Sequence, residues 1–417
     1  MSLLPKKVII VGGGFAGVQL VRNLDPDLFE ILLIDRLNHH QFQPLFYQVA
    51  TSQLEPTSIT FPLRKLFRDR KSLQIRLAGV LAVNSEEKMI TTTIGEFSYD
   101  ILVIATGCKT NFFGNSNLEK YAYGLKTTYD AIKIRNNILE NFEALLSASE
   151  EEKEYLLNVV IVGAGPTGVE LAGSFAEIKR KILPKDFSAR DISRIRILLL
   201  EGSPDTLGSM SQLAKSASME YLISMGVEVV TSVFVKDYDG NTVLLNNGET
   251  IKSRQVIWTA GVTGNLIDGL KKEDILAGNR LRVDRFNLVN GYQDIYAVGD
   301  IASMETPLYP KGHPQVANVA INQAKNLARN LKAMLLGKPL KVYEYVNLGS
   351  MATIGRNKAV VDLPFMSFKG RLAWFTWMFL HLMLILSVRN KLIIFINWAW
   401  NYFTGDTSLR LILKDRE

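Results

Sequence analysis

Glycines at fixed spacing are the residues in this sequence whose chemistry is easiest to infer. Gly12, Gly14 and Gly17 follow an apolar run at residues 7–11 and open a stretch with helical spacing at Phe15–Asn23. In such a pattern the first glycine allows a tight turn, the second lets the backbone approach a pyrophosphate, and the third brings helix and strand close together. The phosphates would lie at the helix N-terminus, where free N–H groups favour anions.

An acidic residue stands where such a loop needs one. Asp35 lies eighteen residues past Gly17, at the end of a second apolar run at residues 30–34. A carboxylate at this strand end can accept hydrogen bonds from ribose hydroxyls. The order strand, glycine turn, helix, strand, acid therefore predicts a dinucleotide site, against the alternative of a glycine-rich turn in an unrelated α/β fold.

The same unit appears again about 150 residues later. An apolar run leads into Gly163, Gly165 and Gly168, and Arg196–Leu200 ends at Glu201. An acid at this place repels a 2′-phosphate, so NADH is favoured over NADPH. Two copies of one nucleotide-binding unit form an internal duplication, which predicts an α/β fold with two Rossmann-like domains.

Three further strand ends complete the pattern. The run at residues 99–104 leads into Thr106-Gly107, the run at 256–260 ends at Gly261, and the run at 295–298 leads into Gly299-Asp300. The acid at position 300 could bind a ribityl hydroxyl or the pyrophosphate region of a flavin nucleotide.

Together and in this order, these segments resemble the pyridine-nucleotide:disulfide reductase superfamily. There the first unit and the segment of Asp300 hold FAD, and the second unit, inserted in the first, holds NAD(P)H. The resemblance implies FAD contacts from Gly12, Gly14, Phe15, Ala16, Gly17, Asp35, Val80, Thr106, Gly107, Asp300 and Ala317. It implies NADH contacts from Gly163, Gly165, Gly168, Glu201 and Gly261.

A narrower resemblance spans nearly the whole chain. The segments 42–51, 258–262, 349–356 and 370–381 are similar to type II NADH:quinone oxidoreductases, the single-subunit respiratory dehydrogenases. Disulfide reductases and sulfide:quinone reductases need cysteines that the single Cys108 cannot supply. The resemblance implies a flavoenzyme that takes hydride from NADH onto FAD and passes two electrons to a membrane quinone without pumping protons.

One segment departs from this family. Where the family has two glutamines thought to line the quinone site, this chain has Asn318, Asn322 and Gln323. Asparagine keeps the amide but is one methylene shorter, so the quinone pocket is expected to be reshaped. The alternative is that these residues are polar positions of a helix facing solvent or a dimer partner.

A single carboxylate is the candidate catalytic group. Glu170 lies two residues past Gly168; it is either a first-turn acid favoured by the helix dipole or, as the family resemblance implies, a charged group near nicotinamide and flavin that affects NADH binding or proton supply. Glu177 lies on the same helical face and is expected to be structural at most. Cys108 is given no role, and His381 is expected to be interfacial or paired. The four histidines and one cysteine have no ligand spacing, so no metal is expected.

The 417 residues are too many for one core. The expected organisation is a discontinuous FAD domain at 1–115 and 266–335, an NADH domain at 116–265, and a C-terminal region at 336–417 for membrane attachment and dimerisation. From Arg356 onward there are nine Lys and Arg against four Asp and Glu, and four of the five tryptophans lie there. Such a tail suits an anionic membrane surface better than nucleic acid.

The apolar stretches at 372–388 and 392–405 are too short or too interrupted to favour a span. We expect the second to be an amphipathic helix in the membrane interface, with Phe395, Trp398, Ala399 and Tyr402 on its apolar face. The same aromatic surface would also serve a homodimer. Without an apparent leader, the cytoplasmic face of a bacterial inner membrane is the expected location.

Two other functions remain open from the sequence. A soluble NAD(P)H-dependent ferredoxin-type reductase would share both dinucleotide units but would not need the basic, Trp-rich tail. A redox signalling protein that binds NADH and FAD, resembling apoptosis-inducing factor, would react slowly with quinone.

Overall fold

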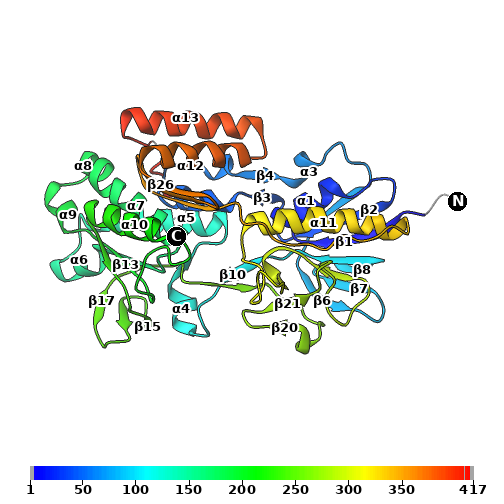
Figure 1. The fold of residues 1–417 in the computed structure, drawn as a ribbon. Helices are drawn as coiled ribbons and strands as arrows, with labels where there is room; N and C mark the ends of the chain where they lie inside the picture. The colour runs from blue at the N-terminus through cyan, green and yellow to red at the C-terminus, as the bar shows by residue number, and fades with distance from the viewer. Residues whose placement is uncertain (1–3, 408, 414–417) are drawn as a thin grey trace. The chain divides into compact units, whose positions relative to one another are not determined.

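The computed structural model describes residues 4–407 and 409–413, which fall into two compact units built from alternating segments of the chain (Figure 1). Unit 1 comprises Met1–Gln41, Phe61–Lys109 and Val262–Val346. Unit 2 comprises Phe42–Thr60, Thr110–Gly261 and Asn347–Glu417. These units describe packing, and the functional domain bounds expected from the sequence stay a prediction.

Unit 1 is built on a five-stranded parallel sheet in the order β22-β9-β1-β2-β5. Its strands are short apolar runs buried on both faces, as parallel sheets require. Two helices, α1 (Phe15–Asn23) and α11 (Ala317–Leu335), pack against each other. The strands are β1 (Lys6–Val11), β2 (Phe29–Asp35), β5 (Leu73–Leu77), β9 (Ile101–Ile104) and β22 (Ile295–Ala297). The predicted strand–helix–strand unit is confirmed here almost residue for residue.

Smaller sheets complete unit 1. They are formed by β6 (Val80–Asn84), β7 (Met89–Thr92) and β8 (Gly95–Ser98), and by β20 (Ile275–Leu276), β21 (Arg280–Val283) and β23 (Ala302–Met304). Short elements beside them are β3 (His39–Gln41), β4 (Thr60–Pro62), α3 (Leu63–Leu66), β10 (Cys108–Thr110), β19 (Val262–Gly264), η4 (Lys272–Asp274) and η5 (Gly299–Ile301).

Unit 2 repeats the parallel sheet, in the order β11-β18-β12-β13-β14. Its strands are β11 (Tyr123–Gly124), β12 (Asn158–Val162), β13 (Arg196–Leu200), β14 (Val227–Val230) and β18 (Gln255–Trp258). Its longer helices are α5 (Thr128–Ala144), α7 (Pro166–Glu177) and α10 (Gln212–Ser224). The duplication read from the glycine motifs is therefore a duplication of the fold.

An antiparallel hairpin sheet and other short segments surround this core. The hairpin sheet is β15 (Val235–Tyr238), β16 (Thr242–Leu245) and β17 (Thr250–Lys252). The short helices are η1 (Gln43–Leu45), α2 (Phe46–Ala50), η2 (Pro56–Ser58), α4 (Ser116–Tyr121), α6 (Glu150–Leu156), the π-helix η3 (Ile178–Ile182), α8 (Leu183–Asp186) and α9 (Ala189–Arg194).

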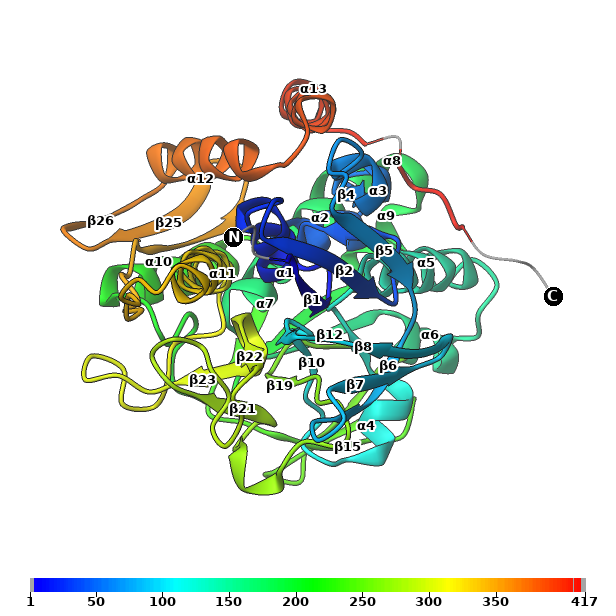
Figure 2. The same cartoon turned by 90° about the vertical axis from the view of Figure 1, so that its right-hand side faces the viewer.

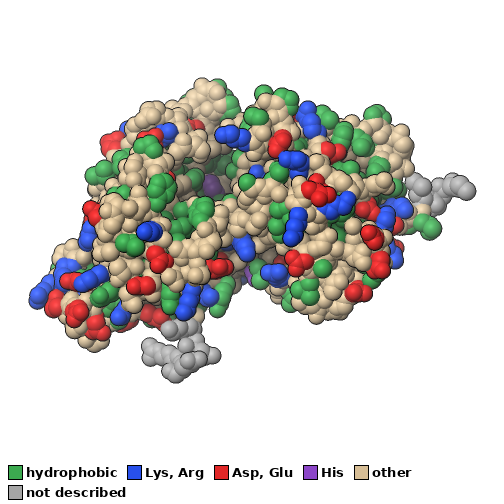
Figure 3. Space-filling view, turned by 90° about the horizontal axis from the view of Figure 1, so that it is seen from below, with side chains coloured by type: hydrophobic (Ala, Val, Ile, Leu, Met, Phe, Trp, Pro, Cys, Tyr) green, Lys and Arg blue, Asp and Glu red, His purple; other side chains and the backbone are tan. Residues whose placement is uncertain are grey.

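In Figure 3, acidic and basic side chains are interspersed over the face of the chain that is drawn there.

The C-terminal segment adds a three-stranded antiparallel sheet and two helices to unit 2 (Figure 2). The strands are β24 (Ser350–Gly355), β25 (Lys358–Leu363) and β26 (Met366–Lys369), and the helices are α12 (Arg371–Leu384) and α13 (Val388–Thr404). Ala359 and Val361 of the sheet pack with Ala373 of α12 in a small core. In the part of the chain that is described, no helix is both long and apolar enough to cross a bilayer.

The expected apolar face of the second tail helix is partly wrong. Trp398 is 8 % exposed, and its indole N–H donates to Gln48 Oε1 at 2.8 Å. Tyr402 lies under the Arg356 guanidinium, 4.0 Å from its ring centre. Both side chains face the protein because α13 packs on α12 and on the segment around α2. The exposed large apolar side chains of α13 are instead Val388, Leu392, Phe395, Ile396, Trp400 and Phe403.

Candidate functional site

The first glycine loop of unit 1 joins β1 to α1 in the geometry that the spacing predicts. Gly12 has φ +112°, and a Cβ on it would lie 2.3 Å from the Ala105 carbonyl oxygen. A Cβ on Gly17 would lie 1.8 Å from the Gly12 carbonyl oxygen, so helix and strand touch backbone to backbone. A Cβ on Gly14 would meet no atom of the described residues within 4 Å. The middle glycine therefore opens onto free space at the helix N-terminus, beside Phe15 and Ala16, where a pyrophosphate would bind.

Asp35 ends β2 beside this loop. Its Oδ2 accepts a hydrogen bond from the Gly13 amide at 2.5 Å, and its Oδ1 accepts one from the Leu37 amide at 2.7 Å. Burial raises the pKa of Asp35, and these two amides oppose the shift. Each carboxylate oxygen keeps a second lone pair, which a ribose hydroxyl could use.

The other predicted FAD contacts also lie in unit 1. The Thr106 hydroxyl donates to the Asn265 carbonyl at 2.7 Å, and Gly107 follows at φ +67° with free space beside its Cα. Asp300 lies in η5, where its Oδ2 accepts a hydrogen bond from the Cys108 thiol at 3.0 Å. Val80 is buried at the start of β6.

Gln323 holds the turn that carries Asp300. Ala317 begins α11, and from that helix the fully buried Gln323 accepts the Gly299 amide on its Oε1 at 2.8 Å. Its Nε2 is buried and has no hydrogen-bond partner among the described residues. Among these residues His40 is similar: its Nδ1 lies 3.0 Å from the Gly13 carbonyl and its buried Nε2 is unpartnered, while burial lowers its pKa to about 4.

These features fit FAD. Gly14 and Gly107 have free space beside their Cα atoms, and Asp35 ends the second strand. The buried Nε2 atoms of His40 and Gln323 have no hydrogen-bond partner among the described residues, whereas buried polar groups normally have one. FAD, when bound, would be held by this loop, Asp35 and the turn at Asp300.

The second glycine loop, in unit 2, repeats the first. Gly163 has φ +99° and packs on the Ala260 backbone, and a Cβ on Gly168 would lie 1.8 Å from the Gly163 carbonyl oxygen. Gly165 precedes α7 and opens onto free space. Glu201 accepts the Ala164 amide on Oε2 at 2.6 Å, which matches the role of Asp35 in unit 1.

Residues near the end of β18 brace this second loop. The Thr259 hydroxyl donates to the carbonyls of Val162 and Gly163 at 2.8 and 2.9 Å. Gly261 has φ +151°, and a Cβ on it would lie 3.1 Å from the Phe113 ring. Thr259 was not among the predicted contacts, although it lies inside the segment 258–262 that carries the family resemblance.

Glu170 is buried in the first half of α7. It is 8 % exposed, and its Oε1 lies 3.4 Å from the Thr353 amide of β24. The helix reaches β24 because Gly173 has no side chain: a Cβ there would lie 1.7 Å from the Ile354 carbonyl oxygen. Burial raises the pKa of Glu170 to about 8, and the Thr353 amide and the Trp377 side chain offset this only in part. A carboxyl group with this pKa can hold and release a proton near neutral pH.

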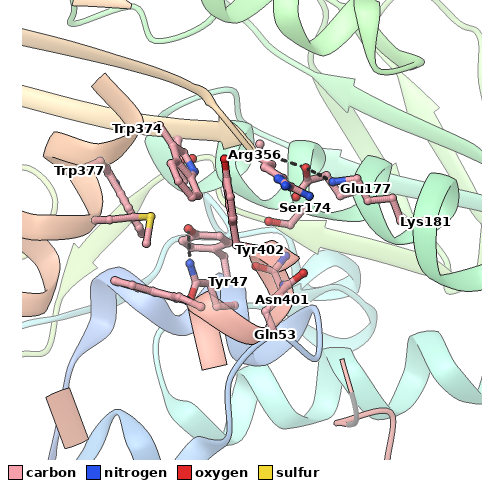
Figure 4. A pocket seen from close by; sticks show the side chains of 15 residues that line it. Tyr47, Gln53, Ser174, Glu177, Lys181, Arg356, Trp374, Trp377, Asn401 and Tyr402 are labelled. Carbon is pink, nitrogen blue, oxygen red and sulfur yellow. Dashed lines mark hydrogen bonds and ion pairs between the residues drawn. The ribbon is translucent and has the colours of Figure 1, made fainter. Parts of the chain in front are cut away.

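A pocket with a mixed aromatic and polar lining lies beside the neighbours of Glu170 within unit 2 (Figure 4). Thr353 and Trp377, the two neighbours that act on Glu170, both line it. It encloses about 60 Å³ and is covered by side chains of α12 and α13. The labelled lining residues in Figure 4 are Tyr47, Gln53, Ser174, Glu177, Lys181, Arg356, Trp374, Trp377, Asn401 and Tyr402.

Aromatic side chains of α12 and α13 cover one side of this pocket. Trp377 is 1 % exposed and stacks on His381, with ring centres 4.1 Å apart. His381 Nδ1 lies 2.8 Å from the Trp377 carbonyl, and burial lowers the pKa of this histidine to about 4. His381 is therefore neutral at neutral pH, and its contact with the Trp377 carbonyl agrees with the expectation that it is interfacial or paired. The sequence did not predict that Trp377 and Tyr47 line one pocket. These residues are 330 positions apart, and only folding brings them together.

The three predicted quinone contacts lie on α11 in unit 1. The Asn322 amide donates to Asn318 Oδ1 at 2.7 Å and to its carbonyl at 3.0 Å, one turn earlier. Gln323 is engaged with Gly299 as described above. Their contact with a quinone stays a prediction.

Comparisons with known proteins agree with this geometry. Residues 6–324 match the family described as pyridine nucleotide-disulphide oxidoreductase, and residues 347–406 match the NDH2 C-terminal domain. The type II NADH:quinone oxidoreductase of Mycobacterium tuberculosis is 32 % identical, over 95 % of this chain and 88 % of that protein. A probable NADH dehydrogenase of Dictyostelium discoideum is 30 % identical, over 96 % and 90 %.

Solved structures share the fold. NDH2 from Plasmodium falciparum in complex with NADH superposes with a TM-score of 0.89 at 24 % identity, covering 99 % of this chain and all of that one. The sulfide:quinone oxidoreductase of Aquifex aeolicus superposes with a TM-score of 0.73 at 19 % identity, covering 96 % of each chain. The two family matches cover both glycine loops, Glu170 and the C-terminal domain. The chain therefore belongs to the type II NADH:quinone oxidoreductases within the pyridine nucleotide-disulphide oxidoreductase family.

Proposed function

We propose that this chain oxidises NADH and reduces a quinone, with Glu170 as the proton donor to the quinone. The observation that carries this assignment is the position of Glu170, which lies two residues past Gly168 of the NADH loop and next to a pocket lined by Thr353 and Trp377. Bound FAD supplies the redox chemistry, while the protein supplies orientation, electrostatics and exclusion of water. Asn318, Asn322 and Gln323 stay proposed as additional quinone contacts.

Each group then has a defined task. The N-terminus of α7 and Glu201 hold the NADH phosphates and ribose, and the unit 1 loop with Asp35 and Asp300 holds FAD. The buried carboxyl of Glu170 keeps its proton at neutral pH, and it lies next to Thr353 and Trp377, which line the pocket. NADH, one proton and a quinone give NAD⁺ and a quinol, so one proton must come from the protein or from solvent, and Glu170 is placed to supply it.

Stopped-flow absorbance of the purified flavoprotein tests the proposal. Mixing with NADH should bleach the flavin band, and a water-soluble quinone should restore it faster than oxygen does. Bleaching without reoxidation by quinone would favour a ferredoxin-type reductase or a signalling protein, and the proposed acceptor would be wrong.

Glu201→Ala should raise the KM for NADH about tenfold or more and leave the KM for quinone nearly unchanged. The variant removes the ribose acceptor and also frees the Ala164 amide that the carboxylate holds. A charged hydrogen bond lost in this way costs roughly 1.5–3 kcal/mol, and 1.4 kcal/mol corresponds to a factor of ten. Steady-state kinetics with each substrate varied in turn measure both constants. Equal changes in the two would contradict the ribose role of Glu201.

The outer surface of α12 and α13 supports attachment to a membrane surface. It exposes Phe379 at 66 %, Trp400 at 63 % and Phe403 at 83 %, with exposed Arg371 and Arg389 near the helix N-termini. Apolar side chains flanked by cations are typical of helices that lie in the interface of an anionic bilayer. We propose that the chain binds there as a peripheral protein on the cytoplasmic face of a bacterial inner membrane, and that it forms a homodimer.

Phe379→Ser and Phe403→Ser should each weaken binding to vesicles of anionic phospholipid about tenfold. Full burial of a phenylalanine side chain contributes about 1.5–3 kcal/mol. Co-sedimentation with vesicles measures the effect, and Tyr129→Ser, which removes an equally exposed aromatic from α5, is the matched control. Equal binding by all four proteins would rule out this surface, while sedimentation equilibrium tests the dimer separately.

A further inference from the structure

Glu170 begins a polar row along one face of α7 and η3. Ser174, Glu177 and Lys181 follow it at intervals of four, three and four residues, which is the spacing of one helical face. The last three all line the pocket, Ser174 and Glu177 from α7 and Lys181 from η3, as Figure 4 shows. The row runs from the buried carboxyl to the more accessible side of the pocket, since Glu177 is 19 % and Lys181 is 28 % exposed.

Glu177 is held in place at the far end of this row. Its Oε1 accepts the Arg356 amide at 2.9 Å and pairs with Lys181 Nζ at 3.2 Å. The π-helical turn η3, which begins directly after Glu177, carries Lys181. Such turns inside α-helices are frequently found at functional sites. The expectation that Glu177 is only structural does not explain why it lines the pocket.

Tyr47 supplies a buried hydroxyl to the same pocket. It is 3 % exposed, lines the pocket and accepts a hydrogen bond from Gln48 Nε2 on its hydroxyl oxygen at 2.8 Å, which leaves the hydroxyl proton to donate elsewhere. Burial raises the pKa of Tyr47, and the charges of Glu170 and Glu177 both raise it further. The phenol therefore lies within electrostatic reach of both carboxylates.

The distance along the row requires intermediates. Seven residues of helix span about 10 Å, too far for direct proton transfer between Glu177 and Glu170. A cavity of about 60 Å³ has room for roughly four to six waters, at about 10–15 Å³ each by the same measure. Waters in the pocket, together with the Ser174 and Tyr47 hydroxyls, can bridge this span with ordinary hydrogen bonds.

We propose that Glu177 is a proton-relay residue that reprotonates Glu170 through the pocket, by way of Ser174, Tyr47 and water. This inference rests on the proposed reduction of quinone. After Glu170 gives its proton to a quinone oxygen, its carboxylate takes a proton from the Tyr47 hydroxyl or from a water. That donor is refilled along the chain from the Glu177 carboxyl, which takes a proton from solvent. Each group returns to its starting state, and the net transfer is one proton from solvent to the quinone.

Glu177→Gln tests the relay in the full-length flavoprotein. Reduction of the flavin by NADH should be unchanged, whereas reoxidation by a water-soluble quinone should slow about tenfold or more and be rescued by added imidazole as an external acid. Glu177→Asp should restore most of the rate. Glu220→Gln should behave as the native protein does. It removes an exposed carboxylate of α10 that pairs with Lys369 of β26. A Glu177→Gln protein that reoxidises at the native rate, or whose slow rate imidazole does not restore, would overturn the relay.

A second variant separates a relay from a structural role. Among the described residues, the charged or titratable groups that face or act on Glu177 are Lys181, Arg356 at the β24–β25 turn, Lys358 and Tyr47. Lys181→Met removes the ion-pair partner of Glu177 but keeps the carboxyl, so reoxidation by quinone should keep most of its native rate. Slowing equal to that of Glu177→Gln would mean that the ion pair matters and not the carboxyl proton, and would contradict the relay. If the native protein is not reoxidised by quinone at all, the proposed function fails instead, which keeps the two failures distinct.

Discussion

Glu170→Gln is expected to slow quinone reduction about 10²-fold while leaving the reduction of the flavin by NADH nearly unchanged. The substitution keeps the size of the side chain and a hydrogen-bond acceptor for the Thr353 amide but removes the acidic proton. A positioned general acid typically contributes 10² to 10⁴ in rate. Stopped-flow measurement of the two half-reactions separates them, and equal slowing of both would mean that Glu170 acts on NADH binding.

The same group sets the sign of the pH dependence. Because the pKa of Glu170 is raised to about 8, the native carboxyl is protonated below that pH, and the rate of quinone reduction should fall as pH rises through 8. Glu170→Gln should remove this limb. A native profile that is flat between pH 6 and 9 would contradict the assignment.

Folding stability gives an independent check on the buried carboxyl. A carboxyl whose pKa is higher in the folded than in the unfolded chain binds its proton more tightly when folded, so its contribution is full at low pH and is lost as pH rises toward the folded value. The unfolding temperature of Glu170→Gln, relative to the native protein, should therefore increase between pH 5 and pH 9. An exposed control, Glu220→Gln, should show no such trend.

Gly17→Ala is expected to destabilise the chain and to abolish retention of FAD. The added Cβ would lie 1.8 Å from the Gly12 carbonyl oxygen, a backbone atom in a tight turn that cannot move without displacing α1 from β1. The cost is that of an overpacked core, about 1–3 kcal/mol or more. Thermal unfolding of the apoprotein and the flavin content after purification measure the two effects.

Gly14→Ala is the matched control for the same loop. Its backbone has φ −73° and ψ −162°, which alanine adopts freely, and a Cβ there meets no atom of the described chain within 4 Å. The apoprotein should therefore unfold at the native temperature, whereas FAD should bind more weakly because the methyl group occupies space next to the pyrophosphate. If Gly14→Ala binds FAD as tightly as the native protein, the pyrophosphate does not lie against this glycine.

The nucleotide-binding elements could be predicted because their determinants are local. An apolar run of five residues that ends in glycine, followed by helical spacing and an acid, encodes the strand, the turn and the helix within about 30 residues. Asn158–Val162 and Arg196–Leu200 are strands at the predicted bounds. Gly12 and Gly163 are both at positive φ, as a glycine turn predicts, but their close contacts are with Ala105 and Ala260, which lie far along the chain.

The pocket beside Glu170 could not be predicted in the same way. Trp398 and Gln48 are hydrogen-bonded although 350 residues separate them, and Trp377 packs near Tyr47 with ring centres 6.3 Å apart. The helical periodicity of the tail indicates an apolar face but not which aromatic residues of that face turn inward. For this reason the exposed face of α13 was assigned partly to Trp398 and Tyr402, which the fold buries or covers.

The two dinucleotide loops, their acids and the family follow from local pattern, because glycine spacing and strand periodicity act over short distances along the chain. The environment of Glu170 depends instead on tertiary packing. Its raised pKa comes from burial against β24, which Gly173 permits by letting the helix backbone touch the Ile354 carbonyl. Tertiary packing also decided that Glu177 shares a pocket with Tyr47, because burial and proximity between distant segments depend on how the chain packs and not on local pattern.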